Sequence, residues 1–265
     1  MLRIGLFSDV HANLPALEAV LEDMDATRLD RVYCLGDLVG YGPDPAGVVE
    51  RVRALGISTV RGNYDDGIGN RRGQCGCYYA TAQAKANGER SYAFTDGALD
   101  DVDHAWLAAL PDNVRLEHEG VRVLLAHGSP RKSNEYLLPD RTDELLVRLA
   151  RQADADVVCV GHVHVPYHRA IVEGDGTVHY VSSGSVGKPK DGDPRACWVE
   201  VLLGQLRHVL AEVSDDAAAG PAGSVDANVG LGVRIHRCGY DVEAVAAEIL
   251  GKGLPPAFAE ALRNA

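Results

Sequence analysis

Aspartate, histidine and asparagine residues recur in five short motifs within the first 164 residues of the chain. Neutral imidazole and carboxylate together suit zinc, manganese, iron or nickel. Two such ions about 3.5–4 Å apart need a bridging carboxylate and can clamp a phosphoryl group. The motifs are Asp9-Val10-His11, Gly36-Asp37, Gly62-Asn63, His127-Gly128 and Gly161-His162-Val163-His164. Their residue types therefore point to hydrolysis of a phosphate ester.

Each motif taken alone is weak support for a metal site. Asp-x-His and Gly-Asp occur by chance in many chains, and the pair His162 and His164 alone is more typical of surface histidines. All five motifs, however, directly follow apolar, strand-like runs. Because ligands of open α/β sheets bind at the carboxyl ends of strands, we expect the motifs to converge on one edge.

The elements that position these motifs alternate between strands and helices in the first half of the chain. This alternation indicates parallel crossover units. Segment 62–77, rich in Gly, Asn and Asp, is expected to be a loop. We expect strands at 2–7, 31–35, 57–60, 114–117, 121–126 and 156–160, and helices at 14–24, 45–55, 78–88, 99–110 and 143–151.

The second half has a different pattern. Residues 167–210 contain β-branched runs separated by turns, which is typical of antiparallel strands. Segment 214–230, rich in Ala, Gly, Asp and Ser, is expected to be a flexible excursion. A strand at 231–236 and helices at 241–250 and 255–262 follow. The whole pattern predicts an α/β fold in which two sheets pack face to face with helices outside.

Composition narrows the range of partners. The net charge of −12 disfavours non-specific binding to DNA or RNA, which depends on Lys and Arg at phosphates. Bound metal ions can reverse the sign of the local field. A small phosphorylated substrate such as a nucleotide is therefore compatible with the negative net charge. No apolar run approaches the ~20 residues that span a bilayer, and the N-terminus lacks a signal-peptide pattern. We therefore expect a cytoplasmic protein without a membrane partner, and homo-oligomerisation stays open.

The chain has six cysteines, which we expect to be free thiols in that compartment. Cys34 and Cys159 lie in apolar runs, where buried thiols are common. Cys75 and Cys77 form the one close pair in sequence. Two thiols alone cannot complete a tetrahedral zinc site, so a regulatory or metal role for this pair stays open beside a structural one.

The order and spacing of the five motifs resemble the calcineurin-like metallophosphoesterase superfamily over residues 1 to about 210. The resemblance implies an αββα four-layer sandwich of two mixed β-sheets flanked by helices. It also implies two metal ions bridged by Asp37. One ion would be held by Asp9, His11, Asp37 and His164, and the other by Asp37, Asn63, His127 and His162.

Segments 38–43, 127–131 and 184–189 are similar to the small bacterial and archaeal phosphodiesterase branch of this superfamily. On this basis residues 1–213 form a metallophosphoesterase domain. Residues 214–230 are the excursion, and 231–265 pack on the same domain.

The run Gly62-Asn63-Tyr64-Asp65 departs from the family pattern, in which many members have a histidine where Tyr64 stands. A phenol with a pKa near 10 is a poor general acid but can donate a hydrogen bond. Tyr64 is therefore either a catalytic donor or part of the pocket wall. Asp65 either orients Asn63, Tyr64 or a histidine, or is a turn residue.

Arg131 follows His127 closely and is a candidate for binding phosphate oxygens. Lys188, Lys190 and Arg195 are further candidates, and Arg71 and Arg72 weaker ones. For each of them a solvated surface charge is the alternative. His168 and His179 fall in strand-like stretches and are expected to be structural.

The predicted function is a metal-dependent phosphodiesterase acting on small phosphodiester or nucleotide substrates through metal-activated water. Its cofactors would be two divalent or transition-metal ions, drawn from Mn, Fe, Zn and Ni. The predicted catalytic residues are Asn63, Tyr64, Asp65 and Arg131. The alternatives are a phosphomonoesterase or protein phosphatase of the same superfamily, and a non-catalytic scaffold on this fold.

Overall fold

The computed structural model describes residues 1–174, 176–205, 224–226 and 230–265. Most of the excursion predicted at 214–230 lies outside these residues, as does 206–210 of the predicted antiparallel region. Within the predicted excursion, Ser224–Asp226 form a strand.

One sheet has six strands, with three parallel strands on one side and three antiparallel additions on the other. Strand β1 stands at the junction, parallel to β2 and antiparallel to β9. The spatial order is β10 (Ser224–Asp226), β11 (Leu231–Cys238), β9 (Ala196–Leu203), β1 (Leu2–Phe7), β2 (Arg31–Cys34) and β3 (Ser58–Thr59).

The other sheet has five strands and is also mixed. Strands β5, β6 and β8 run parallel, and the hairpin partners β4 and β7 close its two edges. The spatial order is β4 (Asn113–His118), β5 (Val121–Ala126), β6 (Val157–Val160), β8 (Gly176–Ser183) and β7 (Pro166–Glu173).

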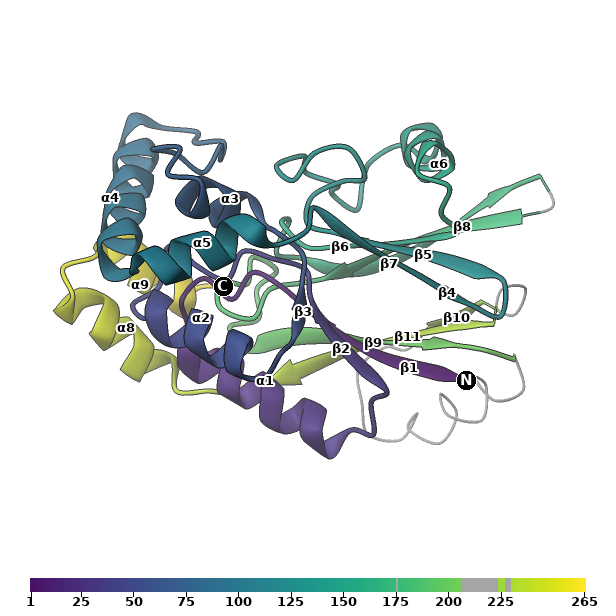
Figure 1. The fold of residues 1–265 in the computed structure, drawn as a ribbon, viewed down its shortest axis with the longest axis horizontal. Helices are drawn as coiled ribbons and strands as arrows, with labels where there is room; N and C mark the ends of the chain where they lie inside the picture. The colour runs from purple at the N-terminus through teal and green to yellow at the C-terminus, as the bar shows by residue number, and fades with distance from the viewer. Residues whose placement is uncertain (175, 206–223, 227–229) are drawn as a thin grey trace.

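The two sheets pack face to face through a buried aliphatic core that includes Leu6 of β1, Val123 of β5 and Val201 of β9. Helix α1 (Leu14–Ala26) covers the outer face of the first sheet, and α6 (Asp143–Gln152) covers that of the second. Figure 1 shows these four layers, which confirm the predicted αββα sandwich.

Further helices gather at the end of the sandwich toward which β1 runs (Figure 1). They are α2 (Pro45–Ala54), α3 (Asn63–Gly69), α4 (Ala82–Ala98), α5 (Asp101–Ala109), α8 (Val242–Gly251) and α9 (Pro256–Arg263). Side-chain caps start several helices of the molecule, for example Asp44 on α2 and Thr142 on α6, as expected for Asp and Thr at this position.

Two local predictions are wrong. The expected loop at 62–77 contains α3, because Asp65 accepts a hydrogen bond from the Gly62 backbone and two acidic residues lie in the first turn. The helix expected at 78–88 instead starts at Ala82, after the cap Thr81, and continues to Ala98. Gly88 lies inside this helix, where an added Cβ would lie 2.2 Å from the Tyr79 hydroxyl.

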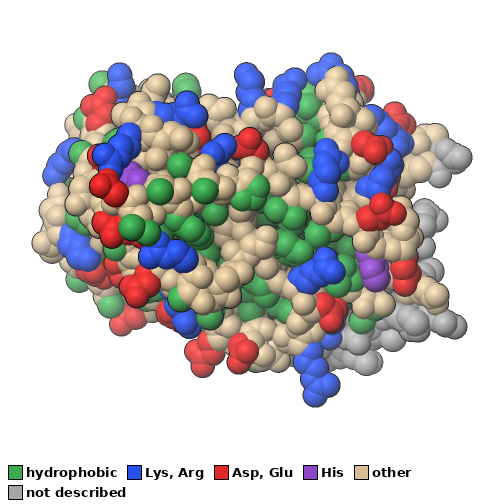
Figure 2. All heavy atoms as spheres, in the orientation of Figure 1, with side chains coloured by type: hydrophobic (Ala, Val, Ile, Leu, Met, Phe, Trp, Pro, Cys, Tyr) green, Lys and Arg blue, Asp and Glu red, His purple; other side chains and the backbone are tan. Residues whose placement is uncertain are grey.

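The surface agrees with the charge argument. On the face drawn in Figure 2, Lys and Arg alternate with Asp and Glu and do not form one broad basic area. Among the helices that the structure describes, none combines the length and apolar character that crossing a bilayer requires.

Candidate metal centre

Seven side chains from both sheets meet at the carboxyl ends of the parallel strands. Asp9 and His11 follow β1, Asp37 follows β2, and Asn63 opens α3 after β3. His127 follows β5 on the second sheet, and His162 and His164 follow β6. Each of the seven exposes 4% or less of its surface, so polar groups are concentrated where the core would otherwise be apolar.

The backbone at this edge is unusual. Asp9, His11, Asp37, His162 and His164 all have φ between 48° and 66°, in the left-handed region that side-chain-bearing residues rarely adopt. Such backbone strain persists where surrounding contacts enforce it, and it clusters at functional sites.

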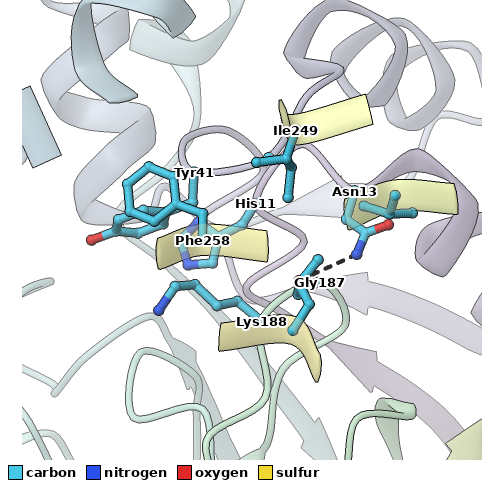
Figure 3. A pocket seen from close by; sticks show the side chains of 10 residues that line it. His11, Asn13, Tyr41, Gly187, Lys188, Ile249 and Phe258 are labelled. Carbon is cyan, nitrogen blue, oxygen red and sulfur yellow. Dashed lines mark hydrogen bonds between the residues drawn. The ribbon is translucent and has the colours of Figure 1, made fainter. Parts of the chain in front are cut away.

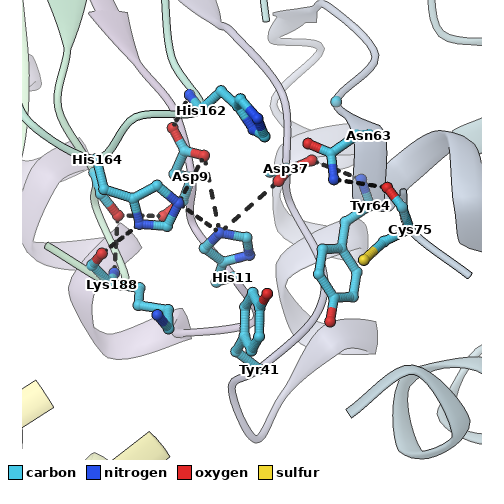
Figure 4. Close-up of polar contacts among 12 residues, drawn as sticks. Asp9, His11, Asp37, Tyr41, Asn63, Tyr64, Cys75, His162, His164 and Lys188 are labelled. Atoms are coloured by element: carbon cyan, nitrogen blue, oxygen red, sulfur yellow. Dashed lines mark hydrogen bonds and ion pairs between the residues drawn. The ribbon is translucent and has the colours of Figure 1, made fainter. Parts of the chain in front are cut away.

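The first group of potential ligands is Asp9, His11 and His164. The Nε2 atoms of His11 and His164 face each other at 3.2 Å, and Asp9 Oδ1 lies 3.3 Å from His164 Nε2. Figure 4 shows the three side chains pointing toward one another. Their ligand atoms are close enough to hold one ion.

The second group is Asp37, His127 and His162. The Asn63 side-chain oxygen joins it, 3.1 Å from His127 Nε2. Asp37 Oδ2 lies 3.4 Å from His127 Nε2 and 3.9 Å from His11 Nε2. This carboxylate oxygen therefore stands between the two groups, where a bridging ligand is required.

Backbone carbonyls fix the orientation of three of the histidines. Nδ1 of His11 lies 3.0 Å from the Val39 carbonyl, and Nδ1 of His127 lies 2.7 Å from that of Leu35. Nδ1 of His164 lies 2.5 Å from the Lys188 carbonyl oxygen. A ring that donates through Nδ1 presents the lone pair of Nε2, which is the arrangement of a metal-ligating histidine.

The electrostatics also fit a cation. Burial lowers the pKa of His11 and of His162 to about 3, so both rings are neutral at physiological pH. Within the described part of the chain, the buried atoms Asp9 Oδ1 and His162 Nε2 have no hydrogen-bond partner. Buried acceptors without donors are costly, and ions bound by the two groups would satisfy them.

Asp65 holds the loops that carry this centre. Its carboxylate accepts hydrogen bonds from the backbone N–H groups of Asp37, Leu38 and Gly62 at 2.8–2.9 Å. It therefore joins the loop after β2 to the start of α3. The sequence predicted that Asp65 orients the side chain of Asn63, Tyr64 or a histidine. In the structure its hydrogen-bond partners are these backbone groups instead.

Tyr64 lies inside the wall of the site. It is fully buried, its hydroxyl donates to Ser91 Oγ at 3.1 Å, and its ring packs on Gly40, where a Cβ would lie 2.4 Å away. Its backbone N–H donates to Asp37 Oδ1 at 2.8 Å. This placement matches the pocket-wall alternative and turns the hydroxyl toward Ser91.

The predicted arginines lie in surface ion pairs. Arg131, on the loop after β5, is half-exposed and pairs with Glu135 at 2.5 Å. Arg195 pairs with Asp193. Arg71 and Arg72 likewise pair with Asp101 and Asp66. On the second sheet, His168 Nε2 lies 3.0 Å from His179 Nδ1, and neither histidine belongs to a ligand group.

Lys188 and Lys190 lie on the loop that wraps His164. The Lys190 backbone donates to the His164 carbonyl, and the positive charges of both lysines lower the pKa of His164 further after burial. The Lys188 ammonium lies 4.8 Å from the centre of the Tyr41 ring. Over the described residues, no carboxylate forms an ion pair with either lysine, so both charges are available to an anion near the centre.

Three aromatic residues beside the metal centre were not predicted as site residues from the sequence. The Tyr41 ring lies edge-on to His11 at 4.9 Å, and Phe258 of α9 lies edge-on to Tyr41 at 5.2 Å. Tyr136 lies 4.1 Å from His162. Figure 3 shows Phe258 and Ile249 approaching His11 from the C-terminal helices. Tyr41 lies in segment 38–43, which was singled out for its similarity to the phosphodiesterase branch. The sequence around Tyr136 and Phe258 carries no comparable signal.

Comparisons with known proteins agree with this geometry. The model of the calcineurin-like phosphoesterase superfamily domain matches residues 2–202. The uncharacterized protein MJ0912 of Methanocaldococcus jannaschii is 30% identical over 208 residues, which are 74% of this chain and 80% of that protein. Phosphodiesterase YfcE of Escherichia coli is 26% identical over 204 residues, 73% of this chain and 84% of the enzyme.

A solved structure extends the similarity beyond the family model. The metallophosphoesterase of Sphaerobacter thermophilus has a TM-score of 0.69 and 27% identity, covering 99% of this chain and 98% of that one. With the family model matching most of its length and both ligand groups assembled between its sheets, the chain belongs to the calcineurin-like phosphoesterase superfamily.

Proposed function

We propose that this phosphoesterase is a phosphodiesterase with a dinuclear metal centre, acting on small phosphodiesters or nucleotides. The observation that carries the proposal is Asp37 Oδ2, which stands between two groups of buried potential ligand atoms. The proposed ligands of one ion are Asp9, His11, Asp37 and His164, and those of the other are Asp37, Asn63, His127 and His162.

Two bound ions of Mn, Fe, Zn or Ni would supply a nucleophilic water and neutralise charge on the phosphoryl oxygens. The protein supplies the positions. Asp65 fixes the Asp37 loop, and the carbonyls of Val39 and Leu35 orient His11 and His127. Lys188 and Lys190 offer positive charge to an anionic substrate.

The inward-turned Tyr64 hydroxyl supports the preference for diesters. A phenol bonded to Ser91 inside the wall does not reach a leaving group, so a good leaving group or metal assistance is needed for bond cleavage. The phosphodiesterase name of the E. coli relative points the same way.

Matched aromatic substrates test the proposal. With added manganese, bis(p-nitrophenyl) phosphate should turn over faster than p-nitrophenyl phosphate. Faster turnover of the monoester would support the phosphomonoesterase alternative instead. Arg131→Ala is the matched control for variants that remove a proposed metal ligand, such as His127→Ala. Arg131 lies on the same loop as His127 but forms its ion pair at the surface.

The scaffold alternative has a separate test. A scaffold would bind neither manganese nor zinc and would hydrolyse neither ester. The complete set of ligand residues favours the enzyme, since function resides in the site and the site is assembled.

A further inference from the structure

Cys75 and Cys77 lie in the segment between α3 and α4 with their sulfur atoms 2.6 Å apart. Gly76, between them, adopts φ +68°, which turns the backbone so that both side chains point to the same side. A disulfide bond is about 2.05 Å long. The backbone therefore already holds the two thiols within about half an ångström of bonding distance.

The pair borders an open cavity of about 460 Å³, which is lined also by Tyr79 and Lys85. Cys77 is partly exposed, and a small oxidant can approach the pair from this side. Cys34, Cys159 and Cys197, in contrast, are fully buried. The position of the pair beside this cavity and the partial exposure of Cys77 thus distinguish it from these structural thiols.

The pair also touches the proposed metal centre through Asn63. The Asn63 amide nitrogen donates to the Cys75 carbonyl at 2.9 Å and to the Cys77 sulfur at 3.3 Å. These two contacts turn the side-chain oxygen of Asn63 toward His127. Figure 4 shows Cys75 beside Asn63 at the edge of the ligand set.

We propose that Cys75 and Cys77 form a reversible dithiol–disulfide site whose oxidation loosens Asn63 at the metal centre. Closing the bond draws the Cys77 sulfur toward Cys75 and away from its contact with the Asn63 amide. The bond itself follows from the geometry of the pair alone, whereas its effect on metal affinity rests on the proposed function.

The oxidant is a low-molecular-weight disulfide. One cysteine sulfur loses its proton and attacks this disulfide, which forms a mixed disulfide and releases one small thiol. The second cysteine then attacks the mixed disulfide, forms the Cys75–Cys77 bond and releases a second small thiol. Two protein thiols are oxidised, one small disulfide is reduced, and both protons leave on the released thiols.

Peptide mapping tests the first half of the proposal. The full-length protein is reduced, freed of reductant, treated with glutathione disulfide, and alkylated after acid quenching. The peptide that contains both cysteines should lose two hydrogens and escape alkylation. Cys75→Ser and Cys77→Ser should each stop at the mixed disulfide. Full alkylation of both cysteines in the treated wild-type protein would overturn the proposal.

Manganese affinity tests the second half. Oxidation should weaken binding by about tenfold, the lower end of the effect of removing a contact behind a metal ligand, and a dithiol reductant should restore it. The double variant Cys75→Ser/Cys77→Ser, which has no thiol at this site, should show the same affinity before and after the treatment. Unchanged affinity in an oxidised protein would refute the link to Asn63. A reduced protein that binds no manganese would refute the proposed centre instead, while the mapping still decides the disulfide.

Discussion

Replacing Asp65 with asparagine tests whether a buried carboxylate holds the metal-binding loops together. The Asp65 oxygens accept three backbone hydrogen bonds, from Asp37, Leu38 and Gly62. In Asp65→Asn one oxygen becomes an NH₂ group, so at least one buried N–H faces another donor, at about 1–3 kcal/mol. Loss of charge assistance in the other bonds adds about 1 kcal/mol each.

The sum predicts that Asp65→Asn lowers the free energy of unfolding by about 3–5 kcal/mol. Urea unfolding of the metal-free protein measures this as a lower midpoint with an unchanged slope. Because the Asp37 backbone is released as well, manganese affinity should fall by about 10- to 100-fold.

The neighbouring residue supplies a matched control. Asp66 pairs with Arg61 and Arg72 near the surface, so Asp66→Asn should change stability by less than about 1 kcal/mol and leave manganese affinity unchanged. Equal stability and equal affinity of the two variants would refute the role assigned to Asp65.

Three further predictions concern the substrate, acid stability and backbone packing. Lys188→Met should lower kcat/KM about 10- to 100-fold, the loss of one charge-assisted phosphate contact; a change within about twofold would exclude that contact. Burial raises the pKa of Glu200, but the nearby His236 ring and the hydrogen bonds from Arg3 and Arg234 outweigh burial and lower the pKa to about 2. Ionised Glu200 therefore stabilises the fold above its unfolded pKa of 4.5, and this stabilisation, about 3 kcal/mol, is lost as pH falls toward 2; Glu200→Gln should show a flatter pH profile of urea stability. A Cβ at Gly187 would lie 1.8 Å from a backbone oxygen of the loop after β1. Gly187→Ala should therefore lower the free energy of unfolding by about 1–3 kcal/mol. Gly239 has open space around it, so Gly239→Ala should leave thermal unfolding unchanged.

The four-layer fold was predictable because its signals are periodic. Strands such as β1 and β6 are apolar runs that end directly before ligand motifs, and α6 begins at a recognisable cap, Thr142. The ligand motifs could be placed on one edge for the same reason, since parallel strands bring their carboxyl ends together.

The features that could not be predicted from the sequence depend on tertiary contacts. The α3 helix was hidden by its glycines, and only the Asp65 contact to Gly62 reveals why the chain turns helical there. The inward direction of Tyr64 depends on Ser91 and Gly40, which are distant in sequence. Phe258 reaches the centre only because the C-terminal helices fold back beside Tyr41.

Metal analysis of the purified protein tests the dinuclear centre most directly. After loading with manganese and removal of unbound metal, the wild-type chain should retain about two ions, and His127→Ala and His164→Ala about one each, because the two histidines serve different ions. Circular dichroism should show the same fold in all three. A wild-type chain that retains one ion or none, or variants that retain as much metal as the wild type, would contradict the assignment of two ions bridged by Asp37.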